Sequence, residues 1–297
     1  MATQLPPLSD VERLSDRVIR ILGGNPGKFT LQGTNTYLIG QGPSRLLIDT
    51  GEGRPIWSET LKSVLAEEQA TVQTALLTHW HPDHIRGVPD LLTLCPDAKV
   101  HKNQPDSPGQ LTIEDGQVFR VDGATLRAYH TPGHAKDHTV FVLEEEDAMF
   151  TGDNVLGHGT SVFEDLPTYI ASLEKMQSCF SGRAYPAHGA VIADGKAKIV
   201  EYIQHRQQRE NEVLYVLKYG VLGKDGEAGG VGSPLPGVQG REAKAWTPME
   251  LVKVIYRDVP ENLHVPAASG VGQVLKKLEG DGKVVREGGE RFKVVIA

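Results

Sequence analysis

The chain has 297 residues, with 31 Lys and Arg against 38 Asp and Glu, which gives a formal net charge of −7. Hydrophobic residues make up 39% of it, and no run approaches the roughly 18 apolar residues of a membrane span. Two cysteines, Cys95 and Cys179, are too few for a disulfide scaffold. Together, these features exclude membrane, collagen-like and disulfide-rich proteins. The acidic side chains near the start, such as Asp10 and Glu12, interrupt any apolar signal segment. We therefore expect a cytoplasmic protein.

The first half of the chain alternates short β-rich runs with helical patterns. Strands are expected at 18–22, 36–39 and 46–49, where aliphatic and β-branched residues are bounded by turns rich in Gly and Pro. In chain order, a helix is then expected at 57–68, a strand at 75–77, a helix at 88–94 and strands at 99–101, 126–129 and 139–143. Each sheet has a face to bury and each helix an apolar stripe. This order therefore predicts an α/β fold of two packed mixed sheets with helices outside.

The last third of the chain has a different pattern. A long helix is expected at 195–220, followed at 221–240 by a Gly/Pro-rich segment that is typical of a linker. Thr247 and Pro248 are typical of a helix start, a second helix is expected at 272–279, and a terminal hairpin joins 283–285 to 292–296. These elements predict a winged-helix-like unit. The predicted organisation is a catalytic domain at 1–219, a linker or loop at 220–245 and the C-terminal unit at 246–297.

Seven His and Asp residues stand where strands end. Four of them lie within six residues, directly after the apolar run 75–77, and the other three each lie beside a glycine after a strand-like run. They are His79, His81, Asp83, His84, His134, Asp153 and His188. Loops at strand ends hold side chains on a rigid scaffold, and a buried His/Asp cluster without a cation would leave charges and lone pairs unsatisfied. The pattern predicts a metal centre.

This set resembles the metal ligands of the metallo-β-lactamase superfamily, whose fold is an αββα sandwich. The resemblance implies two Zn²⁺ per chain, for which imidazole and carboxylate are suitable ligands. It implies that His79, His81 and His134 bind one ion, that Asp83, His84 and His188 bind the second, and that Asp153 bridges them. It also implies that Asp83 is the catalytic residue, because a carboxylate at that position can orient the activated water and move its proton.

Two further residues are interpreted from their context. Asp49 ends a strand-like run and is expected to hydrogen-bond the metal loop, although an ordinary turn residue is an equal alternative. His138 follows His134 closely, and we expect a structural hydrogen bonder because the metal set is already complete.

A closer resemblance involves the blocks 25–37, 48–52, 162–166 and 260–264. They are similar to the fungal metallo-β-lactamase-type thioesterases of polyketide clusters and to the animal β-lactamase-like endoribonuclease, and block 25–37 is nearer to the fungal group. The resemblance to the fungal group implies a thioesterase. It would release the acid from an acyl or polyketide chain on the acyl carrier protein domain of a polyketide synthase. The alternative is cleavage of single-stranded RNA, and a third reading is glyoxalase-like hydrolysis of a small thioester.

The charge balance favours the thioesterase reading over the endoribonuclease reading. Residues 247–297 hold eight Lys or Arg and seven Asp or Glu, and aromatic residues make up only 6% of the chain. Proteins that bind single strands use basic grooves with stacking platforms. We therefore expect a C-terminal unit that acts as a scaffold, and no membrane partner.

Overall fold

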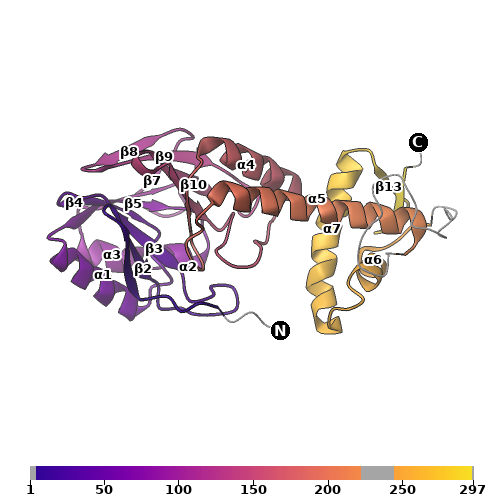
Figure 1. Cartoon of the computed structure of the whole chain (residues 1–297), viewed down its shortest axis with the longest axis horizontal. Coiled ribbons are helices and arrows are strands. Elements are labelled where there is room, and N and C mark those ends of the chain that lie inside the picture. Colours follow the sequence, from indigo (N-terminus) through magenta and orange to yellow (C-terminus); the bar gives the residue numbers. More distant parts are fainter. Residues whose placement is uncertain (1–4, 222–243, 296–297) are drawn as a thin grey trace. The chain divides into compact units, whose positions relative to one another are not determined.

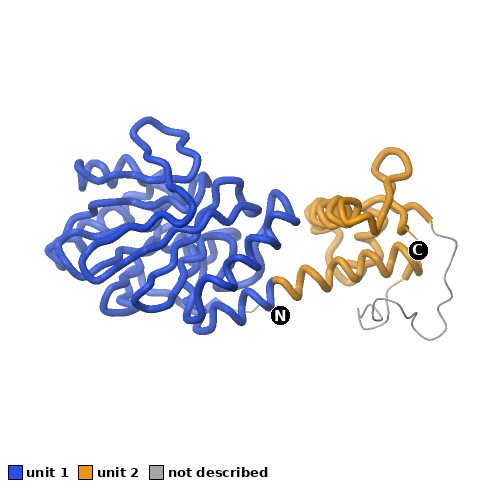
Figure 2. The backbone as a smooth tube through the Cα atoms, turned by 90° about the horizontal axis from the view of Figure 1, so that it is seen from above, with its two compact units in different colours: residues 1–202 blue, residues 203–297 orange. Residues whose placement is uncertain are grey.

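The computed structural model describes residues 5–221 and 244–295 (Figure 1). Contacts divide the chain into two compact units, residues 1–202 and 203–297 (Figure 2). The division falls inside helix α5 (Gly195–Tyr219), whereas the sequence placed the end of the catalytic domain at 219. Most of the predicted linker, residues 222–243, lies outside the described residues. The domain boundaries at 219 and 246 stay predictions.

Unit 1 contains two mixed sheets. The first, in spatial order, consists of β1 (Val11–Ser15), β2 (Val18–Leu22), β3 (Asn35–Ile39), β4 (Ser44–Ile48), β5 (Thr71–Leu77), β6 (Lys99–Lys102) and β7 (Gln110–Thr112). The second consists of β12 (Ala184–Pro186), β11 (Ala148–Gly152), β10 (Thr139–Leu143), β9 (Ala124–His130) and β8 (Val118–Val121). Antiparallel pairs give way to parallel ones from β4 to β7 and between β11 and β12.

The alternation of side chains along the strands builds two cores. Val18 and Tyr37 face a cluster that also contains Phe141 and Phe150 of the second sheet, so this cluster lies between the sheets. Ile19, which follows Val18 on β2, packs in a second cluster with residues of two helices, α1 (Pro55–Glu67) and α3 (Val88–Leu94). Successive side chains of a strand point to opposite faces, so one strand serves both cores. The predicted sandwich of two packed mixed sheets with outer helices is confirmed.

Three elements complete unit 1. The short helix α2 (Pro82–Ile85) follows β5, a 3₁₀ turn η1 (Glu144–Glu146) joins β10 to β11, and α4 (Leu166–Cys179) lies in the segment between β11 and β12. Helix α4 was not predicted, although Asp165 caps it by accepting a hydrogen bond from Thr168 N. Its buried side chains include Tyr169, Leu173 and Met176.

Unit 2 contains the predicted pair of helices and a hairpin. Helix α6 (Pro248–Ile255) starts with a capping box between Thr247 and Glu250, and β13 (Val284–Arg286) pairs antiparallel with β14 (Phe292–Val294). The second helix is longer than predicted: α7 (His264–Gly280) begins just after the 3₁₀ turn η2 (Glu261–Leu263), not at 272. Among the described residues, no helix has the length and apolar character needed to cross a membrane.

Candidate metal centre

The seven candidate ligands lie in four short segments that follow strands of both sheets, and two of them, Asp83 and His84, stand on α2. β5 ends at Leu77 and leads into the metal loop, residues 78–84, while β9, β11 and β12 end shortly before the loops that carry the other three residues. Pro82 is the first residue of α2, which suits the fixed φ of proline. All seven come together in two adjoining groups. The first contains His79, His81, His134 and Asp153, and the second contains Asp83, His84 and His188.

The first group brings three imidazole nitrogens to a common point. His79 Nε2 lies 2.9 Å from His81 Nδ1, and His134 Nε2 lies 3.3 and 3.2 Å from those two atoms. Tetrahedral zinc with Zn–N bonds of about 2.0–2.1 Å separates its nitrogen ligands by about 3.3 Å. The spacing therefore matches three ligands of one zinc-sized cation.

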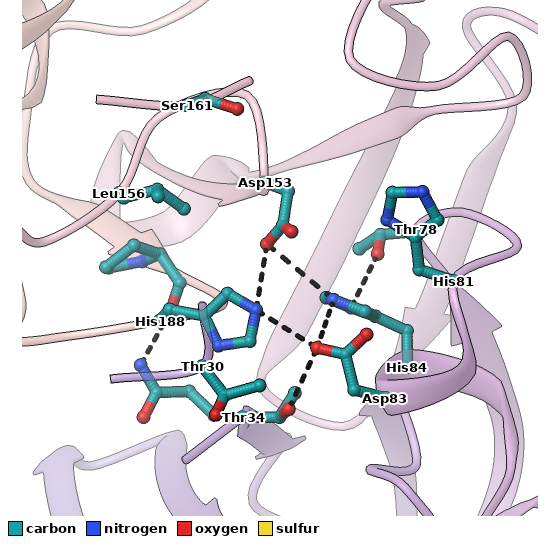
Figure 3. A network of polar contacts seen from close by, with 12 residues as sticks. Thr30, Thr34, Thr78, His81, Asp83, His84, Asp153, Leu156, Ser161 and His188 are labelled. Carbon is teal, nitrogen blue, oxygen red and sulfur yellow. Dashed lines mark hydrogen bonds and ion pairs between the residues drawn. The ribbon is translucent and has the colours of Figure 1, made fainter. Parts of the chain in front are cut away.

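The second group combines a carboxylate with two imidazoles (Figure 3). Asp83 Oδ2 lies 3.4 Å from His84 Nε2 and 3.2 Å from His188 Nε2. Asp153 lies between the groups: its Oδ1 is 3.6 and 3.3 Å from the same two nitrogens. Asp153 Oδ2 is instead 3.5 Å from His134 Nε2 in the first group. One carboxylate thus turns an oxygen toward each group.

Unpaired buried atoms test whether a metal fits. In the described part of the chain, His84 Nε2 and Asp153 Oδ1 are buried without a hydrogen-bond partner. Leaving a buried polar atom unpaired is costly, whereas a cation between the two atoms would satisfy both. The donor set, imidazole nitrogen with carboxylate oxygen, is also the set that zinc and related cations prefer. The residues therefore fit a metal cofactor.

Electrostatics prepare these side chains for metal binding. Burial lowers the pKa of His79 and lowers that of His81 to about 4, so both imidazoles are neutral with free lone pairs. Burial raises the pKa of Asp83, but contacts with two neighbouring imidazoles outweigh burial and hold that pKa well below its usual range. Burial lowers the pKa of His188, but the charge of Asp153 and the hydrogen bonds to Asp153 and Asp83 together outweigh burial and raise that pKa to about 9. The carboxylates thus favour positive charge in the second group, where a cation would replace the proton.

Asp49 hydrogen-bonds the metal loop, which is one of the two alternatives that the sequence left open. Its Oδ1 accepts a hydrogen bond from Thr78 N at 2.8 Å, and its Oδ2 lies 2.7 Å from His84 Nδ1. Because the carboxylate accepts the Nδ1 proton, the Nε2 lone pair of His84 is free to bind a cation. Asp49 adopts a left-handed φ of 59°, and its backbone N donates to Leu76 O.

His138 is a hydrogen bonder, as expected, and uses both ring nitrogens. Asp153 N donates to His138 Nε2 at 3.1 Å, and His138 Nδ1 lies 3.2 Å from Thr131 Oγ1. Since Nε2 accepts, the ring proton is on Nδ1 and points to the threonine. His138 therefore fixes the backbone that carries Asp153.

Sequence reasoning missed Thr34 and Asn35. Thr34 Oγ1 lies 3.4 Å from Asp83 Oδ2, and Asn35 Nδ2 donates to Pro186 O and Gly189 O on either side of His188. Both residues belong to block 25–37, which carried the closer resemblance but received no role. The signal that could have found them is a buried polar pair at the start of a strand.

A hollow of about 550 Å³ opens beside the metal loop. Trp80, which lies between two candidate ligands and is 40% exposed, lines it together with Lys136 and Glu164. The hollow offers an aromatic face and charged groups beside the metal loop.

Two known family profiles match the chain. The profile of the metallo-beta-lactamase superfamily matches residues 29–104 and 96–188, and these segments contain all seven candidate ligands. The chain belongs to the metallo-β-lactamase superfamily. The profile of the beta-lactamase associated winged helix domain matches residues 247–292 of the same chain. Two expectations from the sequence are thereby confirmed: the αββα sandwich of this superfamily and the C-terminal winged-helix unit.

Proteins similar to this superfamily member are known from fungi and bacteria. The atrochrysone carboxyl ACP thioesterase of Aspergillus chevalieri is 50% identical over 290 residues, which cover 96% of this chain and 88% of the relative. The atrochrysone carboxyl ACP thioesterase AgnL7 of Paecilomyces divaricatus is 47% identical, with 97% and 90% covered. A beta-lactamase domain protein from Burkholderia ambifaria shares the fold with a TM-score of 0.78 at 15% identity, over 99% of this chain and 96% of its own.

Proposed function

We propose that this chain is a zinc-dependent thioesterase that hydrolyses the thioester of an acyl or polyketide chain on a carrier protein. The observation that carries the proposal is the near-half identity, over almost the whole chain, to relatives named atrochrysone carboxyl ACP thioesterases. The site supports it, because the candidate ligands of a hydrolytic metal centre are all brought together. The partner is the acyl carrier protein domain of a polyketide synthase. The location is the cytoplasm, which suits two free cysteines.

The proposed ligand sets follow the two groups. His79, His81 and His134 hold one Zn²⁺, Asp83, His84 and His188 hold the second, and Asp153 contributes one oxygen to each. Zinc bound there would polarise the thioester carbonyl and supply a hydroxide-like nucleophile at neutral pH. All these residues stand in short segments that directly follow strands, so little reorganisation is needed when substrate arrives.

Asp83 is the proposed catalytic carboxylate. It makes its hydrogen bond and its closest contacts with both imidazoles through Oδ2, while its side chain remains 22% exposed. Oδ1 can therefore accept the proton of the attacking water and return it to the departing thiolate. Proton transfer by a positioned group contributes about 10²–10⁴-fold to a rate. Trp80, which is 40% exposed, would offer an apolar face to the adjoining acyl carbons.

One assay with two substrates tests the proposal. Zinc-loaded protein is offered an acyl-carrier-protein thioester and, separately, single-stranded RNA. We expect thioester hydrolysis, an Asp83→Asn rate lower by about 10²–10⁴-fold, and no RNA cleavage. Asp97→Asn, which changes an exposed carboxylate outside both groups, should match the parent protein. RNA cleavage that disappears in Asp83→Asn, with the thioester left intact, would overturn the proposal in favour of an endoribonuclease.

A further inference from the structure

The segment between β2 and β3 contains a buried polar pair, Asn25 and Thr34. The side chain of Asn25 makes two hydrogen bonds to Thr34: Thr34 N donates to Asn25 Oδ1 at 2.9 Å, and Asn25 Nδ2 donates to Thr34 Oγ1 at 3.0 Å. Asn25 is 7% exposed and Thr34 is fully buried. The first bond settles the amide orientation, because a backbone N–H can only donate and the amide atom facing it must be the oxygen.

This orientation determines where the Thr34 hydroxyl proton points. Since the Asn25 amide nitrogen donates to Thr34 Oγ1, the hydroxyl accepts there and keeps its own proton for another acceptor. Asp83 Oδ2 lies 3.4 Å away, and an ionised carboxylate can only accept (Figure 3). The hydrogen bonds therefore run in one direction, from Asn25 through Thr34 to Asp83. The last contact is longer than the usual 2.5–3.0 Å of O–H···O bonds, so its effect is to orient the carboxylate more than to bind it strongly.

The neighbouring residue, Asn35, hydrogen-bonds the segment that carries His188, another member of the second group. Asn35 Nδ2 donates to Pro186 O at 2.8 Å and to Gly189 O at 2.9 Å, and Asn35 N donates to Ala187 O at 2.7 Å. These three carbonyls flank His188, and Thr34 forms an isolated β-bridge with His188 itself. Two consecutive residues thus connect the loops that carry Asp83 and His188. In the described parts of the chain, no side-chain hydrogen bond joins Thr34 or Asn35 to the three histidines of the first group.

We propose that Asn25 and Thr34 are positioning residues. They hold Asp83 Oδ2 toward His84 and His188, the other members of the second group, and so set the metal affinity of the second group alone. The proposal rests on the proposed dinuclear zinc site. Groups that orient a metal ligand typically change metal affinity by about 10–100-fold when they are removed. A residue that merely filled space would affect both halves through stability, or neither.

Zinc titration of the full-length protein against a chromophoric chelator tests this, because it reports two separate affinities. We expect Thr34→Val to bind the first ion as the parent does and the second about 10–100-fold more weakly, and Thr34→Ser to restore it. Thr36→Val is the matched control. Thr36, on β3, is as fully buried as Thr34, and its hydroxyl donates to Ile21 O and accepts from Trp57 Nε1, but among the described residues its side chain hydrogen-bonds no candidate ligand. It should keep both affinities.

Asn25→Asp provides an independent variant of nearly the same shape. A carboxylate cannot donate to Thr34 Oγ1, so the hydroxyl proton should turn toward residue 25 and away from Asp83. We expect the second affinity to fall about 10-fold or more, as in Thr34→Val. The added negative charge by itself would attract a cation, so a loss of affinity points to the turned hydroxyl.

The outcomes separate this proposal from the function. Unchanged affinity for the second ion in Thr34→Val and Asn25→Asp overturns it while leaving the thioesterase intact; if Thr34→Val fails to fold by circular dichroism, Asn25→Asp alone decides. Equal weakening of both ions, or loss in Thr36→Val as well, also overturns it. A parent protein that binds two ions but cleaves no thioester contradicts the proposed function and not the positioning role.

Discussion

Asp153 faces both groups of candidate ligands with a single side chain. Its Oδ2 lies 3.5 Å from His134 Nε2, and its Oδ1 lies 3.3 Å from His188 Nε2. The residue follows Gly152, which has a left-handed φ of 51°, and its backbone N is held by His138. Removing this carboxylate should therefore affect both proposed metal ions, in contrast to the changes at Thr34.

We predict that Asp153→Ala lowers the metal content of purified protein from two ions toward one or none. The remaining imidazoles would lose the anionic oxygen that offsets the cations' charge. Elemental analysis after gel filtration measures the metal-to-protein ratio, and Asp97→Ala is the control. Two retained ions together with full activity would contradict the bridging role.

At the scale of elements, the turn that carries His134 is packed tightly against α4. Gly133 has a φ of 127°, and a Cβ placed on it would lie 2.3 Å from Tyr169 Cα. Glu164 N also donates to Gly133 O at 2.7 Å, just before the helix. The turn and the helix thus define each other's position, and only glycine fits between them.

We predict that Gly133→Ala destabilises unit 1 clearly more than Gly109→Ala does. Both glycines have a positive φ, but Gly109 has open space around it, so its substitution adds backbone strain without a clash. Thermal unfolding measures the difference. A strained backbone alone costs about 1–3 kcal/mol, and each 1 kcal/mol lowers the melting temperature of a domain of this size by about 2–4 °C. Equal melting temperatures for the two variants would contradict the packing argument.

At the scale of the whole molecule, all seven candidate ligands belong to unit 1. A metal that binds only the folded state stabilises it by mass action, by about 2.7 kcal/mol at a free concentration 100 times its dissociation constant. That stabilisation acts on the loops that supply the ligands.

We predict that chelation raises amide hydrogen exchange in the metal loop and around residues 131–138 and 184–189, and leaves α6 and α7 unchanged. Hydrogen-exchange mass spectrometry with and without a chelator measures this, and added zinc should restore the protection. Equal loss of protection in α7 would contradict the assignment of the metal to unit 1.

Local signals in the sequence were sufficient for much of this protein. The candidate ligands could be recognised because they follow apolar strand runs, and the start of α6 because Thr247 and Pro248 act within one helical turn. His138 could be interpreted as a structural hydrogen bonder because the metal set was already complete, whereas Asp49, at the end of a strand-like run, was left with two equal alternatives. Helix α7 was predicted too short because Gly270, just before the predicted start at 272, disfavours helix locally, whereas burial of Val271 extends the helix through it.

Other features depend on residues that are far apart in the chain. The separate directions of the two Asp153 oxygens, the contact of Gly133 with Tyr169, and the hydrogen bonds from Asn35 to the carbonyls around His188 exist only once the two sheets are packed. The sequence by itself determined which residue types stand at the strand ends, since those preferences act over a few neighbouring residues. Only the tertiary structure decided which atoms meet, because the direction of a hydrogen bond between distant loops is set by the packing of the whole sandwich.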